Sequence, residues 1–266
     1  MKILVVIGFL FLFLNPANSK AQDSISEKFN VTEFDFNGRN AKIVFPKKPN
    51  EDGLWVWRAR FWVHEPQTDI ALLEKGFHLV YVDVAGLFGN NEAVEIWNDF
   101  YKYVVKKYHL NTKTVLEGMS RGGLIVYNWA TQNTEKVFCI YADAPVSDIN
   151  SWPRGMYAGS GSEKEWKECL EAHGLDEKSV LEFEGMPIYT AVKVAKARIP
   201  VLHVCGASDK VVPYEENTRK LEEKFRAAGG EIQIILKEGI GHHPHSLENP
   251  KPIVDFILKH TKTEPK

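Results

Sequence analysis

The fold is decided by the stretch KTVLEGMSRGGLIVYNWA, residues 113–130. It opens with a β-branched run typical of a strand and closes with apolar residues at helical spacing. Between these parts stands Gly118-Met119-Ser120-Arg121-Gly122, a G-x-S-x-G pentapeptide. At a strand-to-helix turn this pattern predicts a nucleophile elbow, which lifts a serine above the edge of a sheet. A Ser/Gly turn without chemistry would contain the same pentapeptide, so the rest of the chain must decide between the two interpretations.

The two glycines of the pentapeptide have a steric reason. A turn that raises Ser120 strains its backbone, and side chains at Gly118 and Gly122 would collide with the adjoining strand and helix. The first turn of the following helix directs unpaired N–H groups toward the serine, where an oxyanion would form.

The composition is that of one ordinary globular domain. The chain has 266 residues, of which 44% are hydrophobic and 26% charged, enough for one large α/β domain. The formal net charge of −2 gives no basic footprint, so nucleic acid is not expected as a partner.

The N-terminus has the pattern of an export signal. Lys2 precedes the apolar run Ile3–Leu14, which is too short to span a bilayer, and Ser19-Lys20-Ala21 has the small-x-small form of a cleavage site. We therefore expect residues 1–21 to be a signal peptide and residues 22–266 a single exported domain, periplasmic or secreted, without a membrane partner after cleavage. A buried N-terminal strand or helix is the alternative.

The cysteines do not indicate a disulfide scaffold or a metal site. Cys139, Cys169 and Cys205 are odd in number and lack the spacing of metal ligands. Cys139 and Cys205 lie within apolar strand runs and are expected to be small buried hydrophobic residues. Export permits a disulfide, but the sequence assigns no pairing.

Taken in order, the chain opens with a hairpin and continues with alternating strands and helices. Two alternating segments flank Asn37-Gly38, the strongest two-residue hairpin signal. Besides the strand before Gly118 and the helix after Gly122, we expect strands at 31–36, 41–45, 54–58, 77–84, 137–142, 199–205 and 231–236, and helices at 67–75, 92–108, 163–173, 177–183, 213–229 and 252–260.

This order predicts an α/β fold with a mostly parallel sheet flanked by helices and an N-terminal antiparallel hairpin. Residues from about 147 to 195 break the rhythm and are expected to form a small helical cap insertion. In such sheets the loops at the carboxyl ends of the strands form the site.

Two of those loops hold an acid and a histidine. Asp209 follows the strand at 199–205 in Gly206-Ala207-Ser208-Asp209, and His242 follows the last strand in Gly239-Ile240-Gly241-His242. Ser120, Asp209 and His242 therefore occur in the chain order expected for a nucleophile elbow on this type of sheet.

These three loops, around Ser120, Asp209 and His242, resemble the signature loops of the α/β-hydrolase superfamily. The resemblance covers essentially the whole chain after the signal and is specific for the fold but not for a substrate. It implies that Ser120 is the nucleophile, His242 the base and then the acid, and Asp209 the carboxylate that orients the imidazole.

Three other residues compete for these roles. His243 and His245 flank Pro244 close to His242, which we favour because it directly follows Gly241. Asp143, after the strand at 137–142, is the reserve acid, and its alternative role is a turn or an anchor for the cap. The histidine cluster does not predict a metal, since it lacks the helical spacing of a zinc protease, and no cofactor is implied.

The oxyanion donors are expected from two loops. One is the backbone N–H of Arg121, directly after the nucleophile. The other should follow the strand at 54–58, where the common His-Gly is replaced by Arg58-Ala59-Arg60-Phe61, so the Ala59 or Arg60 N–H is the candidate.

Arginines and tryptophans near these loops are candidates for substrate binding. Arginine can bind a carboxylate through two hydrogen bonds, and tryptophan offers a flat surface for a sugar. The candidates are Arg58, Trp62, Trp152, Arg154 and Trp166. The alternative is that the arginines join loops to the cap by ion pairs and that the tryptophans pack the cap.

The sequence therefore predicts an exported serine hydrolase that cleaves carboxylic esters through an acyl-enzyme. A small molecule or a glycan that carries acyl groups is the expected substrate. A single-domain serine peptidase of the same fold and a catalytically silent binding protein are the alternatives.

Overall fold

A computed structural model describes residues 25–262, so the predicted signal peptide at 1–21 lies outside the described residues. The strands form one eight-stranded sheet. Their bounds are β1 (Asn30–Phe36), β2 (Arg39–Phe45), β3 (Trp55–Arg58), β4 (His78–Val82), β5 (Thr114–Met119), β6 (Val137–Asp143), β7 (Val201–Gly206) and β8 (Ile232–Lys237).

The sheet is parallel apart from its first two strands. The order is β1-β2-β4-β3-β5-β6-β7-β8, with β1–β2 and β2–β4 antiparallel and the other neighbours parallel. The β1–β2 turn places Asn37 and Gly38 at φ values of 53° and 80°, the left-handed backbone that a tight two-residue hairpin requires. The predicted fold class and its N-terminal antiparallel hairpin are confirmed.

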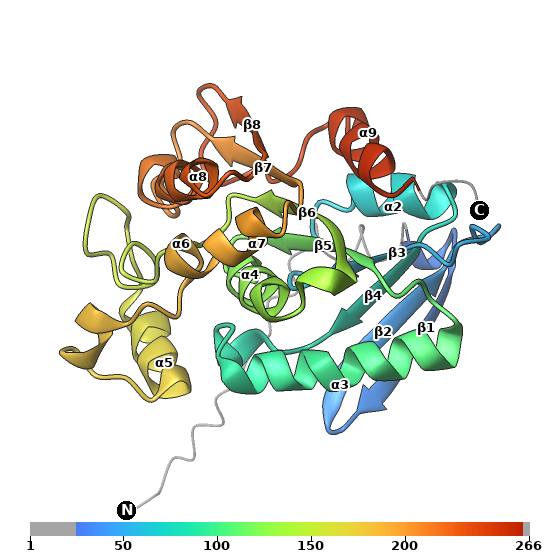
Figure 1. Ribbon diagram of the computed structural model, residues 1–266, viewed down its shortest axis with the longest axis horizontal. Coiled ribbons are helices and arrows are strands. Elements are labelled where there is room, and N and C mark those ends of the chain that lie inside the picture. The colour runs from blue at the N-terminus through green and yellow to red at the C-terminus, as the bar shows by residue number, and fades with distance from the viewer. Residues whose placement is uncertain (1–24, 263–266) are drawn as a thin grey trace, which may run out of the picture.

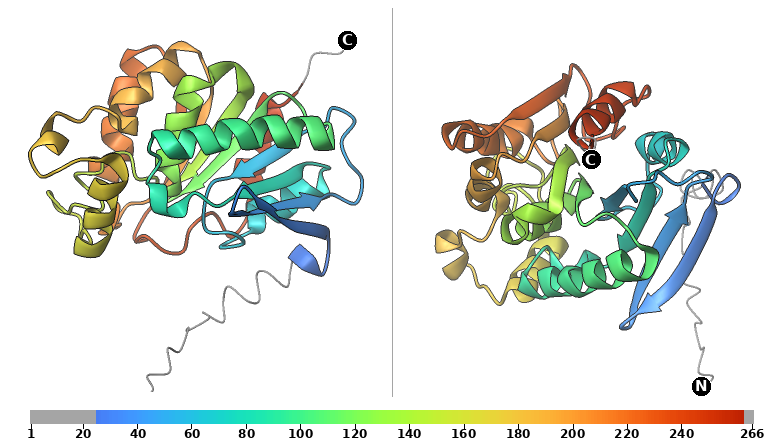
Figure 2. Two further views of the ribbon diagram at one scale, coloured as in Figure 1. Left: turned by 90° about the horizontal axis from the view of Figure 1, so that it is seen from below. Right: turned by 45° about the vertical axis from the view of Figure 1, so that its right-hand side comes forward.

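Helices cover both faces of this sheet (Figures 1 and 2). Leu124, Leu221 and Val194 join the apolar core on one face, whereas Leu72 and Ile253 join the core on the other. The helices are α2 (Gln67–Glu74), α3 (Asn91–Tyr108), α4 (Gly122–Gln132), α5 (Glu163–His173), α6 (Pro187–Thr190), α7 (Val192–Lys196), α8 (Thr218–Ala227) and α9 (Lys251–His260), with single 3-10 turns η1 (Ala85–Leu87), η2 (Thr134–Lys136), η3 (Ser179–Glu182) and η4 (Tyr214–Glu216).

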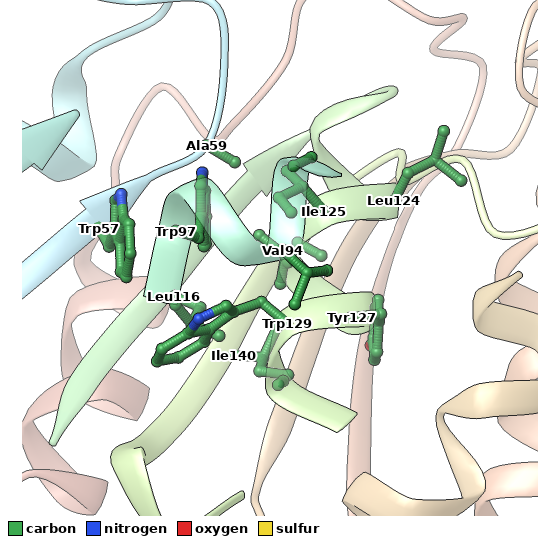
Figure 3. Close-up of a cluster of buried hydrophobic side chains, with 14 of the residues drawn as sticks. Trp57, Ala59, Val94, Trp97, Leu116, Leu124, Ile125, Tyr127, Trp129 and Ile140 are labelled. Carbon is green, nitrogen blue, oxygen red and sulfur yellow. The ribbon is translucent and has the colours of Figure 1, made fainter. Parts of the chain in front are cut away.

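Stacked aromatic rings fill the core between α3, α4 and the sheet. Trp57 on β3 and Trp97 on α3 lie almost parallel with ring centroids 3.9 Å apart, and Trp129 of α4 meets Trp57 edge-on at 5.2 Å (Figure 3). Offset stacking and edge-to-face contacts are the arrangements that the charge distribution of aromatic rings favours. The aromatic positions of α3 thus build the core that supports β3 and β5.

The segment between β6 and β7 departs from the strand–helix alternation. It carries α5, η3, α6 and α7, and Figure 1 shows α5 on the side of the molecule opposite the β1–β2 hairpin. Buried Glu216 joins the segment to η4, because its carboxylate accepts hydrogen bonds from the Ala158 and Gly159 N–H groups at 2.6 and 3.2 Å. Among residues 25–262, no helix is long and apolar enough to cross a bilayer.

Candidate active site

The site is organised around Ser120, which stands in the turn between β5 and α4. Its φ of 50° is left-handed, and its N–H donates to the Asp143 carbonyl at 2.8 Å. A Cβ on Gly118 would lie 2.9 Å from Val126 Cγ2, as expected, whereas one on Gly122 would lie 3.4 Å from Arg60 Cβ, an ordinary contact, so the collision expected at Gly122 is wrong. The second close approach is at Gly123, where a Cβ would lie 2.6 Å from Pro145 Cβ. Only glycine therefore allows the strand and the helix to meet closely enough to raise Ser120 above the sheet.

A hydrogen-bonded chain links Ser120 to the two residues that the sequence pairs with it. His242 Nε2 lies 3.1 Å from Ser120 Oγ, and His242 Nδ1 lies 2.7 Å from Asp209 Oδ2. Asp209 Oδ1 accepts the N–H groups of Val211 and Val212 at 2.8 and 2.9 Å, which fixes the carboxylate against the imidazole. With Nδ1–H donated to Asp209, His242 presents the lone pair of Nε2 to the serine hydroxyl.

The structure excludes one of the two candidate oxyanion donors after β3. The Ala59 N–H donates to the Glu117 carbonyl at 2.9 Å within the sheet, so the expectation that Ala59 supplies an oxyanion donor is wrong. The Arg60 N lies 3.8 Å from the position that a Cβ on Gly122 would take, at the start of α4. Within residues 25–262, no carbonyl accepts the backbone N–H of Arg60 or of Arg121, so both can face an oxyanion.

Arg58 anchors the loop that carries Arg60. Its guanidinium is 1% exposed, forms ion pairs with Asp69 and with Glu117 (3.0 Å), and donates to the carbonyls of Phe61 (2.9 Å) and His64. The prediction that Arg58 binds substrate is therefore wrong, since its guanidinium is buried and donates its hydrogen bonds to groups inside the protein.

The charges around Arg58 are unbalanced, because one cation faces two carboxylates. Burial and the neighbouring Asp69 raise the pKa of Glu117 well above its usual value. A protonated Glu117 leaves one negative charge against the one positive charge of Arg58, which is the arrangement a buried site tolerates.

The side chain of Arg121 joins the elbow to the segment between β6 and β7. It pairs with Glu165 on α5 and lies over the rings of Phe88 (5.1 Å) and Trp152 (5.8 Å). Burial lowers the pKa of Arg121, with Glu165 acting in the opposite direction. Trp152, which the sequence predicts to bind substrate, thus lies against the Arg121 side chain at the elbow.

Three other predicted substrate-binding residues serve the protein's own packing, which corrects the sequence expectation. Arg154 pairs with Glu177 at 3.0 Å, and buried Trp166 donates its indole N–H to the same carboxylate at 2.6 Å. Trp62 packs against Tyr81 on β4, with ring centroids 5.5 Å apart. These contacts match the alternative for these residues, in which the arginine forms an ion pair and the tryptophans pack within the protein.

Asp143, the reserve acid, faces a different histidine. Its Oδ1 lies 2.5 Å from His245 Nδ1, and its Oδ2 accepts the Ser246 N–H at 2.7 Å. It therefore holds the loop after β8, whereas the carboxylate that contacts His242 is that of Asp209. His243 is exposed on the whole, but the partial burial of its ring lowers its pKa, and the neighbouring His245 acts in the same direction.

His64 is the residue near this loop that the sequence analysis missed. Its ring lies 5.6 Å from that of His243 and 5.7 Å from that of His245, measured between centroids. The rule that loops at the carboxyl ends of parallel strands share one edge could have found it, because His64 lies in the loop after β3.

Two hollows share Gly89 in their linings, and the smaller one reaches the elbow. The smaller, about 10 Å³, is lined by Arg60, Phe88, Arg121 and Gly122 among others. The larger, about 310 Å³, lies between the start of α3 and the segment that contains α5. The space next to the two backbone donors therefore holds little more than one water-sized group.

Comparisons with known proteins identify the family and the fold. The profile of the prolyl oligopeptidase family matches residues 67–264. Among proteins of curated function, no relative matches the chain.

Solved structures with a similar fold include peptidases and esterases. An acylaminoacyl peptidase from Pyrococcus horikoshii is 15% identical with a TM-score of 0.67, over 90% of this chain and 43% of its own, so the chain spans less than half of that peptidase. Est1E from Butyrivibrio proteoclasticus is 18% identical with a TM-score of 0.61, over 86% of this chain and 98% of its own. A thermostable esterase from Pseudomonas putida is 15% identical with a TM-score of 0.66, over 94% and 90%.

The role of Arg58 predicts a large effect of its removal. Arg58→Ala leaves the Asp69 carboxylate buried without a counter-charge, so the free energy of unfolding should fall by about 3–5 kcal/mol. Arg154→Ala, which removes an ion pair to the mostly exposed Glu177, should cost less than about 1 kcal/mol. Urea unfolding of both variants checks this, and equal losses would contradict the anchoring role.

Proposed function

Since the chain belongs to the prolyl oligopeptidase family and has the α/β-hydrolase fold, we propose that it cleaves carboxylic esters through Ser120, His242 and Asp209. The hydrogen-bonded chain from Ser120 Oγ through His242 to Asp209, at 3.1 and 2.7 Å, carries this proposal. A binding protein has no need of this arrangement, which argues against the catalytically silent alternative.

The first half of the reaction acylates the serine. Ser120 Oγ attacks the ester carbonyl carbon while His242 Nε2 takes the hydroxyl proton, and Asp209 stabilises the imidazolium that forms. The negative charge on the former carbonyl oxygen is met by the backbone N–H groups of Arg121 and Arg60. When the tetrahedral intermediate collapses, His242 returns the proton to the leaving alkoxide and the acyl group stays on Ser120.

The second half releases the acid. A water molecule gives a proton to His242 Nε2 as it attacks the acyl carbon, and the same two N–H groups meet the new oxyanion. Collapse of this intermediate expels Ser120 Oγ, which recovers its proton from His242. The enzyme returns to its starting state, and one ester has become one acid and one alcohol.

Two observations favour an ester with a small acyl group. The hollow beside Arg60 and Arg121 measures about 10 Å³, which favours a small acyl group. The esterase structures are matched over 90 and 98% of their own chains, which favours an ester as the substrate. The ring of Trp152 beside Arg121 offers a flat surface to a sugar ring. We therefore propose short acyl groups on a glycan or another small molecule as the substrates.

A peptidase is the second candidate function. It is favoured by the family itself and by the similarity to the acylaminoacyl peptidase, although the chain spans 43% of that protein. Amide and ester cleavage share the same acyl-enzyme chemistry, so substrate tests must separate them.

Single substitutions test the assignment of the histidine. Ser120→Ala and His242→Ala should each lower kcat for p-nitrophenyl acetate on the order of 10⁴ to 10⁶-fold, because each removes the proton transfer on which attack depends. His243→Ala, assayed in the presence of EDTA, should lose less than about tenfold. An inactive His243→Ala with an active His242→Ala would transfer the role to His243.

A substrate series tests the acyl group. The value of kcat/KM should be at least about tenfold higher for the acetate than for the octanoate ester of p-nitrophenol, since one methylene beyond the available space costs about 1–3 kcal/mol. Phe88→Ala enlarges the hollow and should narrow this difference, whereas Leu181→Ala, at a side chain 63% exposed, should leave it unchanged. Activity confined to aminoacyl amides, with none on acetylated oligosaccharides, would contradict the ester assignment in favour of a peptidase.

Export is a further part of the proposal. Its support is the run from Lys2 through the apolar Ile3–Leu14 to Ser19-Lys20-Ala21. Protein purified from its native host should begin at Gln22, in the periplasm or the medium. Mass spectrometry that recovers Lys2 in the purified protein would contradict cleavage.

A further inference from the structure

Three imidazoles from two separate loops meet beside His242. His64 lies after β3, and His243 and His245 lie after β8, with one ring nitrogen of each within 4.8 Å of the others. Within residues 25–262 this is the one group of three or more histidine, cysteine or acidic side chains gathered closely enough to hold a metal ion. Imidazole nitrogen is a ligand that Zn²⁺ and its neighbours among the divalent transition metals prefer.

His245 is prepared to act as a ligand. Its Nδ1 lies 2.5 Å from Asp143 Oδ1, so Nδ1 donates to the carboxylate and the lone pair is left on Nε2. The carboxylate is itself held by the Ser246 N–H at 2.7 Å and by the Tyr141 hydroxyl at 3.2 Å. A carboxylate that fixes the ring and tautomer of a histidine from behind is the usual support of a metal-binding imidazole.

His64 is held in place by its backbone. Its carbonyl accepts a hydrogen bond from the buried guanidinium of Arg58, and its N–H donates to the Phe61 carbonyl at 3.0 Å. Val63 and Glu65 on either side have φ values of 55° and 48°, a conformation that side-chain-bearing residues adopt only when their surroundings impose it. The loop therefore presents His64 in one fixed place.

The distances allow a tetrahedral ion after a small movement. Zn–N bonds of about 2.0–2.1 Å place the ligand nitrogens about 3.4 Å apart, so a pair of nitrogens at the present limit of 4.8 Å must approach by about 1.4 Å. His243 is exposed, and its side chain can turn toward buried His245. Three protein ligands leave a fourth position for water, as in an open zinc site.

We propose that His64, His243 and His245 bind a Zn²⁺-type ion, and that the bound ion inhibits the enzyme. The inhibition rests on the proposed ester hydrolysis, whereas the binding does not. The His242 ring lies 4.7 Å from that of His245 and 5.1 Å from that of His243, measured between centroids. Both rings meet the His242 ring edge-on, so the contraction needed to hold the ion moves the imidazole that faces Ser120 Oγ out of its place.

The binding experiment uses Zn²⁺ and chelator-treated protein in a calorimeter. The wild type should bind one ion per chain, and His64→Ala and His243→Ala should each weaken binding at least tenfold. Asp143→Asn should weaken it by about 10–100-fold through His245. His109→Asn is the matched control, because His109 is an exposed histidine at φ 52°, which asparagine tolerates, and its binding should equal the wild type.

Two results would overturn the site. One is a wild type that binds no Zn²⁺ at 100 µM. The other is binding that survives in His64→Ala and His243→Ala but disappears in His242→Ala, which would place the ion on the Asp209–His242 pair. Folding of each variant is checked by circular dichroism, and His243→Ala alters an exposed side chain, so it keeps the test decisive if another variant unfolds.

The activity experiment compares, for each variant, the rate of ester hydrolysis with and without Zn²⁺. The rate of p-nitrophenyl acetate hydrolysis in saturating Zn²⁺, divided by the rate in EDTA, should be below one tenth in the wild type and near one in His243→Ala. A wild-type ratio near one, with the ion bound, would overturn the inhibition. If the protein hydrolyses no ester, the proposed function fails, and the calorimetric result still decides the metal site.

Discussion

Close backbone contact around Ser120 is the constraint on which the site depends. The serine adopts a left-handed conformation, and side chains at Gly118 or Gly123 would meet atoms at 2.9 Å or less. This contact sets where β5 ends and α4 begins, and so directs both the Ser120 hydroxyl and the Arg121 N–H to the same edge of the sheet. The hydrogen bond from Ser120 N–H to the Asp143 carbonyl ties that position to β6.

A buried cation organises the other side of the site. Arg58 ends β3 and gathers the carbonyls of the following loop around its guanidinium, so that loop has a defined shape although it contains neither helix nor strand. That loop carries the Arg60 N–H, which faces the start of α4, and His64, which faces the loop after β8. Arg58, which was expected to bind substrate, thus positions a proposed oxyanion donor, the Arg60 N–H, and a proposed metal ligand, His64.

The sequence was informative where local pattern and topology act together. Alternation, the Asn37-Gly38 turn and the order of strands and helices predicted the sheet, because hydrophobic periodicity reports which face of an element is buried. The rule that carboxyl-end loops share one edge predicts that Ser120, Asp209 and His242 lie together, and in the structure His242 is within hydrogen-bonding distance of both other side chains. Their catalytic role is a proposal.

The errors concern residues whose partners are distant in the chain. Nothing in the local sequence of Arg58 shows that Asp69 and Glu117 fold onto it, and nothing near Arg154 indicates Glu177. Ala59 was misassigned because the length of β3, which decides whose N–H enters the sheet, is fixed by pairing with β5 rather than by residue type. The cluster around His245 also joins residues far apart in sequence, and the shared edge of the loops after β3 and β8 is the one signal that places His64 near it.

Covalent trapping tests the central claim, an activated Ser120, most directly. Wild-type protein is treated with a fluorophosphonate, digested, and mapped by peptide mass spectrometry, with Asp209→Asn treated in parallel. The account predicts one adduct, on the peptide that contains Ser120, and much slower labelling of Asp209→Asn because its imidazole is no longer oriented. An adduct on a different residue, or an unlabelled wild-type protein that is folded, would contradict it.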